Sequence, residues 1–521
     1  MLSKAVRPVL LLALLAVLPW APAAAQEAPD AKKAQASAGD TLLKDTLSER
    51  SHSMTIGGRA LAYRALAGDL VLSDEAGKPK ARMFYVAYLK DTKKGEELRR
   101  RPLTFIWNGG PGSSAVWLHL GAFGPQRVDV DADGKPAPPP YRLVPNENTL
   151  LDVSDLVFVD PVSTGFSRPA PGEEEQQFHN VQADVEWMGE MVRRFVTRHG
   201  RWGSPIFLAG ESYGTVRAAG LADYLQRRFN LYLNGVVLIS PALSMQTFNP
   251  GGLNDLPYVL SLPSFTAAAW YHKKLAPELQ ADLQKALRES EDFAFGDYDD
   301  ALLRGSSLAP EKKTEIAARF ARLTGLPAEE VEKQDLRFDS FTFSSKLFEK
   351  EKRQVGVLDS RYWGYVNQMA AESFAPAYSY ATVDPAAQVF GLFTATLNQY
   401  LRDDLGVKSE ENYEVLSLPA AGSWDYKGVE NRYLFTADNL RVAMTMNPDL
   451  KVFVASGTYD MVTTPLATRY VLDHLGIDPA LRQNLTFAEY PGGHMMYMHE
   501  PSLARLKKDL AAFYESATPR P

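Results

Sequence analysis

A serine in a tight, glycine-rich turn is the first residue of this sequence that could do chemistry. Ser212 lies in the motif Gly-Glu-Ser-Tyr-Gly at residues 210–214, directly after the apolar run 206–209 and before a helical stretch. A strand, a sharp Gly-x-Ser-x-Gly turn and a helix form a nucleophile elbow, which exposes the serine hydroxyl in a strained conformation. The N-terminus of the following helix favours an oxyanion. The pattern predicts that Ser212 is a nucleophile.

A serine nucleophile needs a base, and after a nucleophile elbow the acid and then the histidine follow in the chain. His494 stands in a Pro-Gly-Gly-His segment directly after the strand-like run that ends at Tyr490. Such a loop lies at the C-terminal end of a strand, where we expect a catalytic base. We interpret His499 as a surface or helix-start residue, and His272 and His474 as helix residues with polar partners.

The carboxylate that orients the base is expected at the end of another strand. Asp460 follows the apolar run 451–455 through Ser-Gly-Thr-Tyr and is the predicted acid. Asp473 lies inside a helical stretch and is a weaker candidate. Asp449 precedes the strand and therefore belongs to the wrong end of the sheet.

An oxyanion needs two hydrogen-bond donors. The backbone N–H of Tyr213, the residue after the nucleophile, is the first expected donor. The second should come from an early loop, and the segment Asn-Gly-Gly-Pro-Gly at residues 108–112 directly follows the run 103–107. Its glycines allow the backbone to approach a ligand closely. We assign the second donor to the N–H of Gly110.

Short apolar runs must position these residues. Runs at 103–107, 156–159, 206–209 and 236–239 end in Gly- or Pro-rich loops and alternate with helical stretches such as 181–196. Buried strands that alternate with helices indicate a parallel sheet covered on both faces. Residues 52–89 read as an antiparallel entry to this sheet. The expected fold is α/β, an α/β-hydrolase fold with a mixed, mostly parallel sheet, helices on both faces and an inserted helical cap.

The same patterns divide the chain into segments. We expect a signal peptide at 1–25, a flexible leader at 26–50, a first part of the hydrolase core at 51–242, a helical cap insertion at 243–430 and a second part of the core at 431–521.

The first 25 residues have the character of an export signal. Lys4 and Arg7 precede an apolar run at 9–18, and small residues at 23–25 offer a cleavage site before Gln26. The run is shorter than the ~20 residues that span a bilayer, so an uncleaved anchor is the less favoured alternative. We find no second stretch long enough to span a membrane. We expect a periplasmic or extracellular protein without stable membrane insertion after signal removal.

Composition excludes several classes of protein. The formal net charge of the 521-residue chain is −7 and it contains no cysteine. An acidic balance does not favour nucleic acid as a partner. Disulfides and thiolate metal sites are ruled out, so packing alone must hold the fold. There is no His-Glu-x-x-His pattern for a metalloprotease, and the expected chemistry requires no metal or cofactor.

These motifs together resemble those of the serine carboxypeptidase family. Residues 107–114 are similar to its oxyanion-loop motif, 210–214 to its nucleophile motif and 162–167 to its substrate-loop motif. Residues 457–460 and 492–495 are similar to its acid and base segments, and all of these motifs occur in the expected order. The resemblance implies peptide substrates that lose single residues from the C-terminus.

The resemblance also implies how the terminal carboxylate of the substrate is bound. It assigns this role to Asn108, Gly109 and Glu211. Glu211 beside a substrate carboxylate should have a raised pKa, because two like charges cannot both ionise. This favours activity in mild acid, whereas His494 must stay neutral to act as a base. Ala122 stands where the family carries a further carboxylate-binding Glu, and Ser163 where it usually has Gly.

Two alternative functions remain. An esterase or acyltransferase could use the same triad, and Ala122 makes this more plausible. A non-catalytic binding protein on a hydrolase scaffold is the alternative of another class. The side-chain preference, the oligomeric state and the role of the cap are left open by the sequence.

Overall fold

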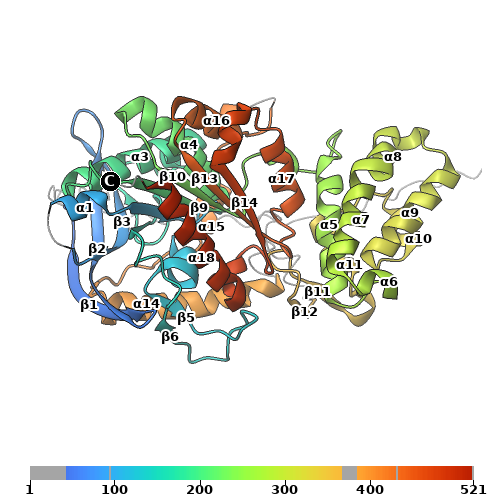
Figure 1. The fold of residues 1–521 in the computed structure, drawn as a ribbon, viewed down its shortest axis with the longest axis horizontal. Coiled ribbons are helices and arrows are strands. Elements are labelled where there is room, and N and C mark those ends of the chain that lie inside the picture. The colour runs from blue at the N-terminus through green and yellow to red at the C-terminus, as the bar shows by residue number, and fades with distance from the viewer. Residues whose placement is uncertain (1–42, 93–94, 367–383, 430–431, 519–521) are drawn as a thin grey trace, which may run out of the picture. The chain divides into compact units, whose positions relative to one another are not determined.

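The computed structural model describes residues 43–92, 95–366, 384–429 and 432–518. The predicted signal peptide and the leader up to residue 42 lie outside these residues. In the described part, a ten-stranded sheet has the order β1-β2-β3-β7-β4-β9-β10-β13-β14, with β8 paired to β3 (Figure 1). The strands are β1 Ser48–Ile56, β2 Arg59–Ser73, β3 Pro79–Lys90, β4 Leu103–Trp107, β7 Asp155–Val159, β8 Arg168–Pro169, β9 Ile206–Glu211, β10 Gly235–Ile239, β13 Lys451–Gly457 and β14 Leu485–Tyr490.

The direction of pairing changes along this sheet. The strands β1, β2, β3 and β7 pair antiparallel, as expected for the entry segment. From β7 through β4, β9, β10 and β13 to β14, every pairing is parallel. The predicted mixed, mostly parallel sheet is confirmed. Because parallel strands share a direction, the loops after β4, β9, β13 and β14 lie at one edge of the sheet.

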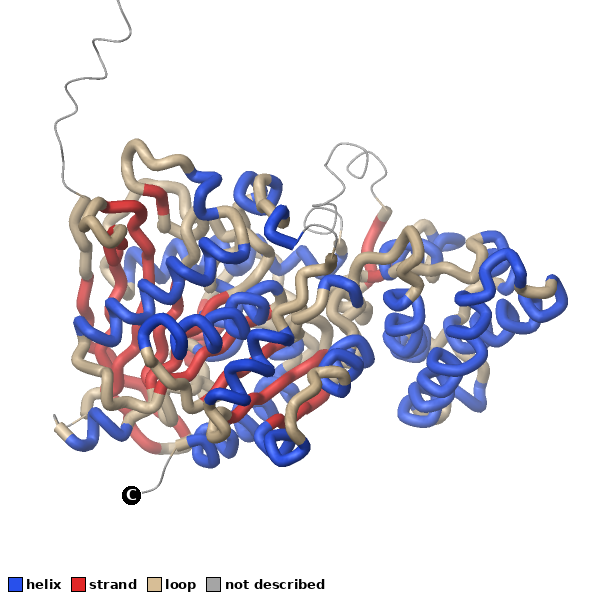
Figure 2. The backbone as a smooth tube through the Cα atoms, turned by 90° about the horizontal axis from the view of Figure 1, so that it is seen from above, coloured by secondary structure: helices blue, strands red, loops and turns tan. Residues whose placement is uncertain are grey.

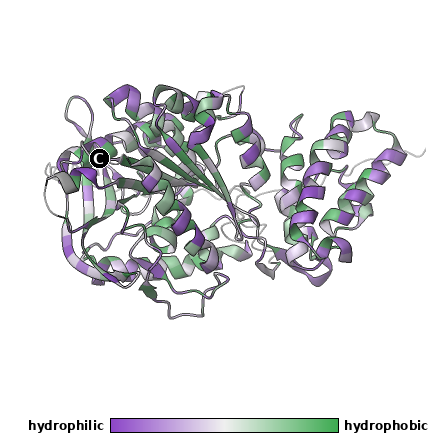
Figure 3. Cartoon of the chain, in the orientation of Figure 1, coloured by the Kyte–Doolittle hydropathy of each residue, from purple (hydrophilic) through white to green (hydrophobic). Residues whose placement is uncertain are grey.

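Helices cover both faces of the sheet. Val236 and Leu238 of β10 pack in one hydrophobic cluster with α3 (Val181–Arg198), α4 (Tyr213–Phe229) and α16 (Ala437–Met446). Val237 and Ile239 pack in the other, with α14 (Phe390–Asp403) and α18 (Glu500–Ala517). Alternate residues of a strand face opposite sides of a sheet. Figure 2 shows red strands between blue helices, and the central strands of the sheet are largely green, hydrophobic, in Figure 3.

The segment predicted as one helical cap divides between two cores. Its first part supplies most of a separate hydrophobic cluster, which also includes Met461 from the loop after β13. The helices in this cluster are α5 Leu256–Tyr271, α6 Pro277–Gln280, α7 Leu283–Phe293, α8 Asp299–Arg304, α9 Pro310–Thr324, α10 Ala328–Lys333 and α11 Ser340–Lys346. In contrast, α14 buries Leu392, Leu397 and Leu401 against the sheet. The cap over 243–430 stays a prediction, and the structure shows that α14 packs against the sheet and not in the cluster of α5 to α11. The prediction rests on the lack of strand signals, which does not show where a helix packs.

The end of the predicted leader also differs from the expectation. Thr46 exchanges two backbone hydrogen bonds with Asp69, at 3.2 and 3.1 Å, and β1 begins at Ser48. Residues 43–50 are thus held at the edge of the sheet by β2. Main-chain pairing needs no apolar periodicity, so the sequence pattern could not reveal it.

Further short elements lie between these helices and strands. They are α1 Glu96–Arg100, α2 Val116–Leu118, the π-helix η1 His119–Phe123, β5 Gln126–Val128, β6 Leu143–Pro145, β11 Arg353–Val355, β12 Trp363–Tyr365, α15 Leu418–Gly422 and α17 Pro465–Asp473. No helix within the described ranges has both the length and the apolar character needed to cross a membrane.

Candidate active site

Ser212 occupies the sharp turn between β9 and α4. Its φ of 57° and ψ of −129° are strained for a residue with a side chain. A Cβ atom on Gly210 would lie 2.2 Å from the carbonyl oxygen of Gly214, so the turn can close only with glycine at this position. The Ser212 N–H donates to the carbonyl of Ile239 on β10, at 2.9 Å. The predicted elbow geometry is present.

His494 and Asp460 meet at the ends of β14 and β13. His494 Nδ1 lies 2.8 Å from Asp460 Oδ2, and both side chains are buried. Asp460 is held in turn by the N–H groups of Val462 and Thr463, at 2.7 and 2.9 Å, and by the Thr463 hydroxyl at 2.6 Å. A carboxylate acceptor assigns the proton to Nδ1 and leaves Nε2 as the basic nitrogen. This is the arrangement that a general base requires.

Two opposing effects act on His494. Burial disfavours its charged form, but the Asp460 charge and hydrogen bond outweigh this effect and raise the pKa of His494 above its ordinary value. Among the described residues no hydrogen bond joins the Ser212 hydroxyl to His494, although both residues line one cavity. Catalytic hydrogen bonds are often long until a substrate binds.

The alternative histidines and acids lie elsewhere. His272 and His474 end helices and bond carbonyls of Ser360 and Tyr470, both at 2.7 Å. His499 begins α18 and contacts the Ser502 hydroxyl at 2.8 Å. Asp473 is the last residue of α17, and Asp449 precedes β13. The geometry pairs none of these residues with the Ser212 turn.

The predicted oxyanion segments pack against each other. A Cβ atom on Gly109 would lie 2.4 Å from the backbone nitrogen of Tyr213, so only glycine allows the loop after β4 to reach the elbow. Gly110 has a φ of +101°, which L side chains rarely adopt. Tyr213 opens α4, so its N–H has no partner inside the helix. The N–H groups of Gly110 and Tyr213 are thus two candidate donors on adjoining backbone.

Asn108 and Glu211 form a buried pair beside Ser212. Asn108 Nδ2 donates to Glu211 Oε2 at 2.7 Å, while Asn108 Oδ1 accepts from the Leu118 N–H at 3.1 Å. Burial raises the pKa of Glu211 to about 7, against the opposing effects of the nearby His494 charge and of hydrogen bonds from Tyr497 and Asn108. The raised pKa agrees with the expectation, although the cause here is burial and no substrate is needed.

The two departures from the family motifs have different surroundings. Ala122 is fully buried in the hydrophobic cluster on the α14 side of the sheet. Ser163 adopts a φ of 70°, and its hydroxyl contacts His179 Nε2 at 2.8 Å. This contact holds a serine in a conformation that favours glycine.

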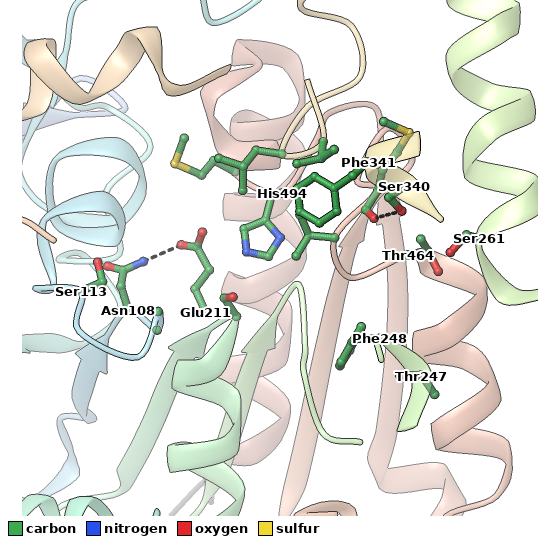
Figure 4. A pocket seen from close by; sticks show the side chains of 18 of the residues that line it. Asn108, Ser113, Glu211, Thr247, Phe248, Ser261, Ser340, Phe341, Thr464 and His494 are labelled. Carbon is green, nitrogen blue, oxygen red and sulfur yellow. Dashed lines mark hydrogen bonds between the residues drawn. The ribbon is translucent and has the colours of Figure 1, made fainter. Parts of the chain in front are cut away.

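One cavity of about 390 Å³ is lined by Ser212, His494, Asn108, Glu211 and Gly110. In Figure 4, Asn108 and Glu211 lie on one side of His494, and Phe341, Ser340, Thr464 and Ser261 lie on the other. Its lining comprises Asn108, Gly109, Gly110, Ser113, Trp117, Glu211, Ser212, Thr247, Phe248, Pro250, Pro257, Ser261, Asp339, Ser340, Phe341, Val357, Leu358, Phe390, Leu416, Met461, Val462, Thr464, His494 and Met495. The described residues contain no group of three or more His, Cys, Asp or Glu suited to a metal ion.

Sequence reasoning missed a segment that holds both the acid and the base loops. We call residues 357–361 the clamp segment. The Leu358 carbonyl accepts the His494 N–H at 2.5 Å. The Val357 carbonyl accepts the Met461 N–H, and the Ser360 N–H donates to the Tyr459 carbonyl, both at 3.0 Å. These are backbone contacts over long sequence distances, for which the sequence carries no local signal. Tyr497, which donates to Glu211 Oε2 at 2.6 Å, was missed for the same reason.

The topology of the sheet, with an elbow serine after β9 and a paired Asp and His after β13 and β14, defines an α/β-hydrolase fold. The model of the family described as serine carboxypeptidase matches residues 72–501. The chain belongs to the serine carboxypeptidase family, as the motifs indicated.

Two similar proteins illustrate the relationship. Serine carboxypeptidase-like 36 from Arabidopsis thaliana is 29% identical over 175 residues, which are 32% of this chain. The chain thus matches about a third, 33%, of the length of that plant relative. The crystal structure of KEX1(delta)p, a prohormone-processing carboxypeptidase from Saccharomyces cerevisiae, has a TM-score of 0.53 at 16% identity. The match covers 87% of this chain and 91% of that one, and it supports the fold.

Proposed function

We propose that this chain is an exported serine carboxypeptidase that removes single residues from peptide C-termini. The observation that carries the proposal is the buried Asn108–Glu211 pair in the same cavity as Ser212 and His494. An ordinary esterase has no need of a neutral carboxyl and an amide beside its nucleophile. A peptide C-terminus does need such donors, because its carboxylate must be bound without a second full negative charge.

In the proposed reaction Ser212 Oγ attacks the scissile carbonyl carbon while His494 Nε2 accepts its proton. The N–H groups of Gly110 and Tyr213 stabilise the oxyanion. His494 returns the proton to the leaving amino group, the C–N bond breaks, and an acyl-enzyme remains on Ser212. Water then attacks the ester, with His494 again as the base, and releases the shortened peptide. Asp460 holds the His494 ring throughout.

The cavity favours apolar substrate side chains. Its aromatic walls include Trp117 and Phe390, whose ring centroids lie 4.8 Å apart, on the side of the oxyanion loop. Phe248, Met461 and Val462 also line it, while its described lining includes Glu211 and Asp339 but neither Lys nor Arg. Burial of apolar side chains is favourable, whereas an acidic side chain would face the carboxylate of Asp339. We therefore propose a preference for apolar residues at the end of the peptide.

The test is digestion of an unblocked peptide with an apolar C-terminal sequence, followed by mass spectrometry over time. A ladder that shortens from the C-terminus by single residues supports the proposal. Ser212→Ala is the control and should leave the peptide intact. Ester hydrolysis with intact peptide would instead favour the esterase or acyltransferase, and internal cleavage of the peptide would contradict the removal of single C-terminal residues. A Ser212 that fails to react with a fluorophosphonate would favour the non-catalytic binding protein.

Export rests on the sequence pattern of residues 1–25 alone. If the signal is cleaved after Ala25, the mature protein begins at Gln26. N-terminal mass spectrometry of the protein from the periplasmic or culture fraction tests this. A full-length protein that begins at Met1 and stays with the membrane would indicate an uncleaved anchor.

A further inference from the structure

Two donors converge on one oxygen of Glu211. Oε2 accepts from Asn108 Nδ2 at 2.7 Å and from the Tyr497 hydroxyl at 2.6 Å. Within the described residues no hydrogen bond occupies Oε1, and Glu211 lines the cavity. Figure 4 shows the Asn108–Glu211 contact on one side of His494. Thus Oε2 of Glu211 is bonded to two protein donors, and Oε1 is available to a ligand in the cavity.

This asymmetry decides where a proton resides on neutral Glu211. In a protonated carboxyl group one oxygen accepts and the other donates. Because Oε2 already receives two N–H or O–H donors, it acts as the carbonyl oxygen, and the proton belongs on Oε1. A hydroxyl at Oε1 can donate to an anionic ligand in the cavity. If Oε2 had only one of these two donors, the proton could also reside on Oε2. Oε1 would then have no hydrogen to donate to the ligand.

The absence of a side chain at Gly121 leaves space for the Tyr497 ring. The Tyr497 side chain is fully buried, and a Cβ atom on Gly121 would lie 2.6 Å from the Tyr497 ring carbon Cε2. Glycine at 121 in the π-helix η1 therefore makes room for the ring. The neighbouring Ala122, also fully buried, offers no polar group to Glu211. The donor to Oε2 comes instead from the turn that follows His494.

We propose that Tyr497 is a positioning residue for recognition of the substrate's terminal carboxylate: together with Asn108 it fixes Oε2 of Glu211 as the acceptor and so directs the Oε1 hydroxyl to the ligand. The inference rests on the proposed carboxypeptidase function.

The titration of Glu211 supplies a readout beyond activity. The groups that face it are His494 and Asp460, which are charged or can be, and the neutral Asn108 and Tyr497. The Tyr497 hydrogen bond lowers the pKa of Glu211, since it stabilises the carboxylate, although burial dominates and raises it. Removal of the phenol hydroxyl should therefore raise this pKa further. The Glu211 carboxyl group of the variant would then lose its proton at a higher pH than in the wild-type protein.

The experiment compares Tyr497→Phe with wild type on two blocked dipeptides that differ only in a free C-terminal carboxylate or an amide. We expect the ratio of kcat/KM, free acid over amide, to fall about tenfold, mainly through KM, as for loss of one hydrogen bond. The alkaline limb for the free acid should move to higher pH. Tyr298→Phe is the matched control. The buried Tyr298 hydroxyl donates to the Leu336 carbonyl at 2.7 Å, in the hydrophobic cluster that the helices α5 to α11 form.

A folded Tyr497→Phe protein with the wild-type ratio and alkaline limb would overturn the proposal. So would an equal loss on both dipeptides, which indicates a structural role only. If Tyr497→Phe does not fold, Gly121→Ala tests the same hydrogen bond, because the added methyl group displaces the Tyr497 ring from Glu211. This variant should also lower the ratio of kcat/KM for the free acid over the amide. A wild-type enzyme without preference for the free acid would overturn the proposed function itself, before any variant is measured.

Discussion

The carboxylate of Asp359 accepts a hydrogen bond from the backbone N–H of Gly493 at 3.0 Å, one residue before the candidate base. A Cβ atom on Gly493 would lie 2.3 Å from the Asp359 Cβ atom. Asp359 is also paired with Arg361, whose Nη2 lies 2.6 Å from Oδ2, and both side chains are buried. The clamp segment therefore fixes the position of His494 through a charged, buried side chain from outside the sheet.

Asp359→Ala should weaken both the fold and the turnover. It leaves Arg361 buried without its partner, which typically costs ~3–5 kcal/mol, and it releases the Gly493 loop. We expect the protein to unfold at a lower denaturant concentration. We also expect kcat to fall, with a smaller change in KM. The exposed pair Asp300–Arg304 supplies the control, since Asp300→Ala should alter neither quantity. An Asp359→Ala protein with wild-type kcat would contradict the role of the clamp segment.

Asp460→Asn should abolish most of the activity without unfolding the protein. The amide keeps the shape of the side chain but disfavours the tautomer with a proton on Nδ1, and a loss on the order of 10³–10⁴-fold in kcat is expected. Asp473→Asn is the matched control. It makes the same chemical change at the weaker candidate acid, which lies at the end of α17. Circular dichroism shows whether both variants fold. Equal activity of the two variants would remove Asp460 from the triad.

The pH dependence should differ between substrates. Recognition of a free carboxylate needs neutral Glu211, whose pKa is raised to about 7, so this activity should fall as pH rises through that value. His494 must be neutral, so activity on any substrate falls in acid. Hydrolysis of the amide or of an ester should lack the alkaline decline. Glu211→Gln, which keeps an N–H donor at every pH, should remove the alkaline limb for the free acid as well. Identical profiles for both substrates would contradict the assignment of Glu211.

Gly109→Ala should destroy the oxyanion site. The new methyl group would lie 2.4 Å from the Tyr213 nitrogen and force the loop away from the elbow. Loss of one oxyanion donor costs about 10²–10³ in kcat, and we expect at least that. Gly203→Ala is the control, since its nearest neighbour, Arg99 Cγ, lies at an ordinary 3.6 Å. A measured kcat near the wild-type value for Gly109→Ala would show that this loop lies elsewhere.

The sequence predicted what depends on local patterns. Ser212, Asp460 and His494 each follow an apolar strand in a short turn, and a parallel sheet brings such turns to one edge. The family and the mixed sheet could be predicted on the same basis and are confirmed. The catalytic roles of these three residues stay predictions until they are measured.

What the sequence could not predict depends on contacts between distant segments. The Tyr497 hydroxyl reaches Glu211 across 286 positions, and Asp359 reaches Gly493 across 134; neither contact has a period or motif. The packing of α14 against the sheet could not be predicted, because an amphipathic helix can cover either core. The pairing of Thr46 with β2 could not be predicted, because it uses backbone hydrogen bonds, which any residue can make.

The proposed carboxypeptidase function requires that the Asn108–Glu211 pair binds the carboxylate of a peptide C-terminus. The most direct measurement is kcat/KM of the wild-type protein on one blocked dipeptide with a free C-terminal carboxylate and on its C-terminal amide, at a pH below 7. We predict a preference for the free acid of at least about tenfold, the equivalent of one hydrogen bond to a charged group. Equal rates, or a preference for the amide, would contradict binding of a terminal carboxylate by this pair.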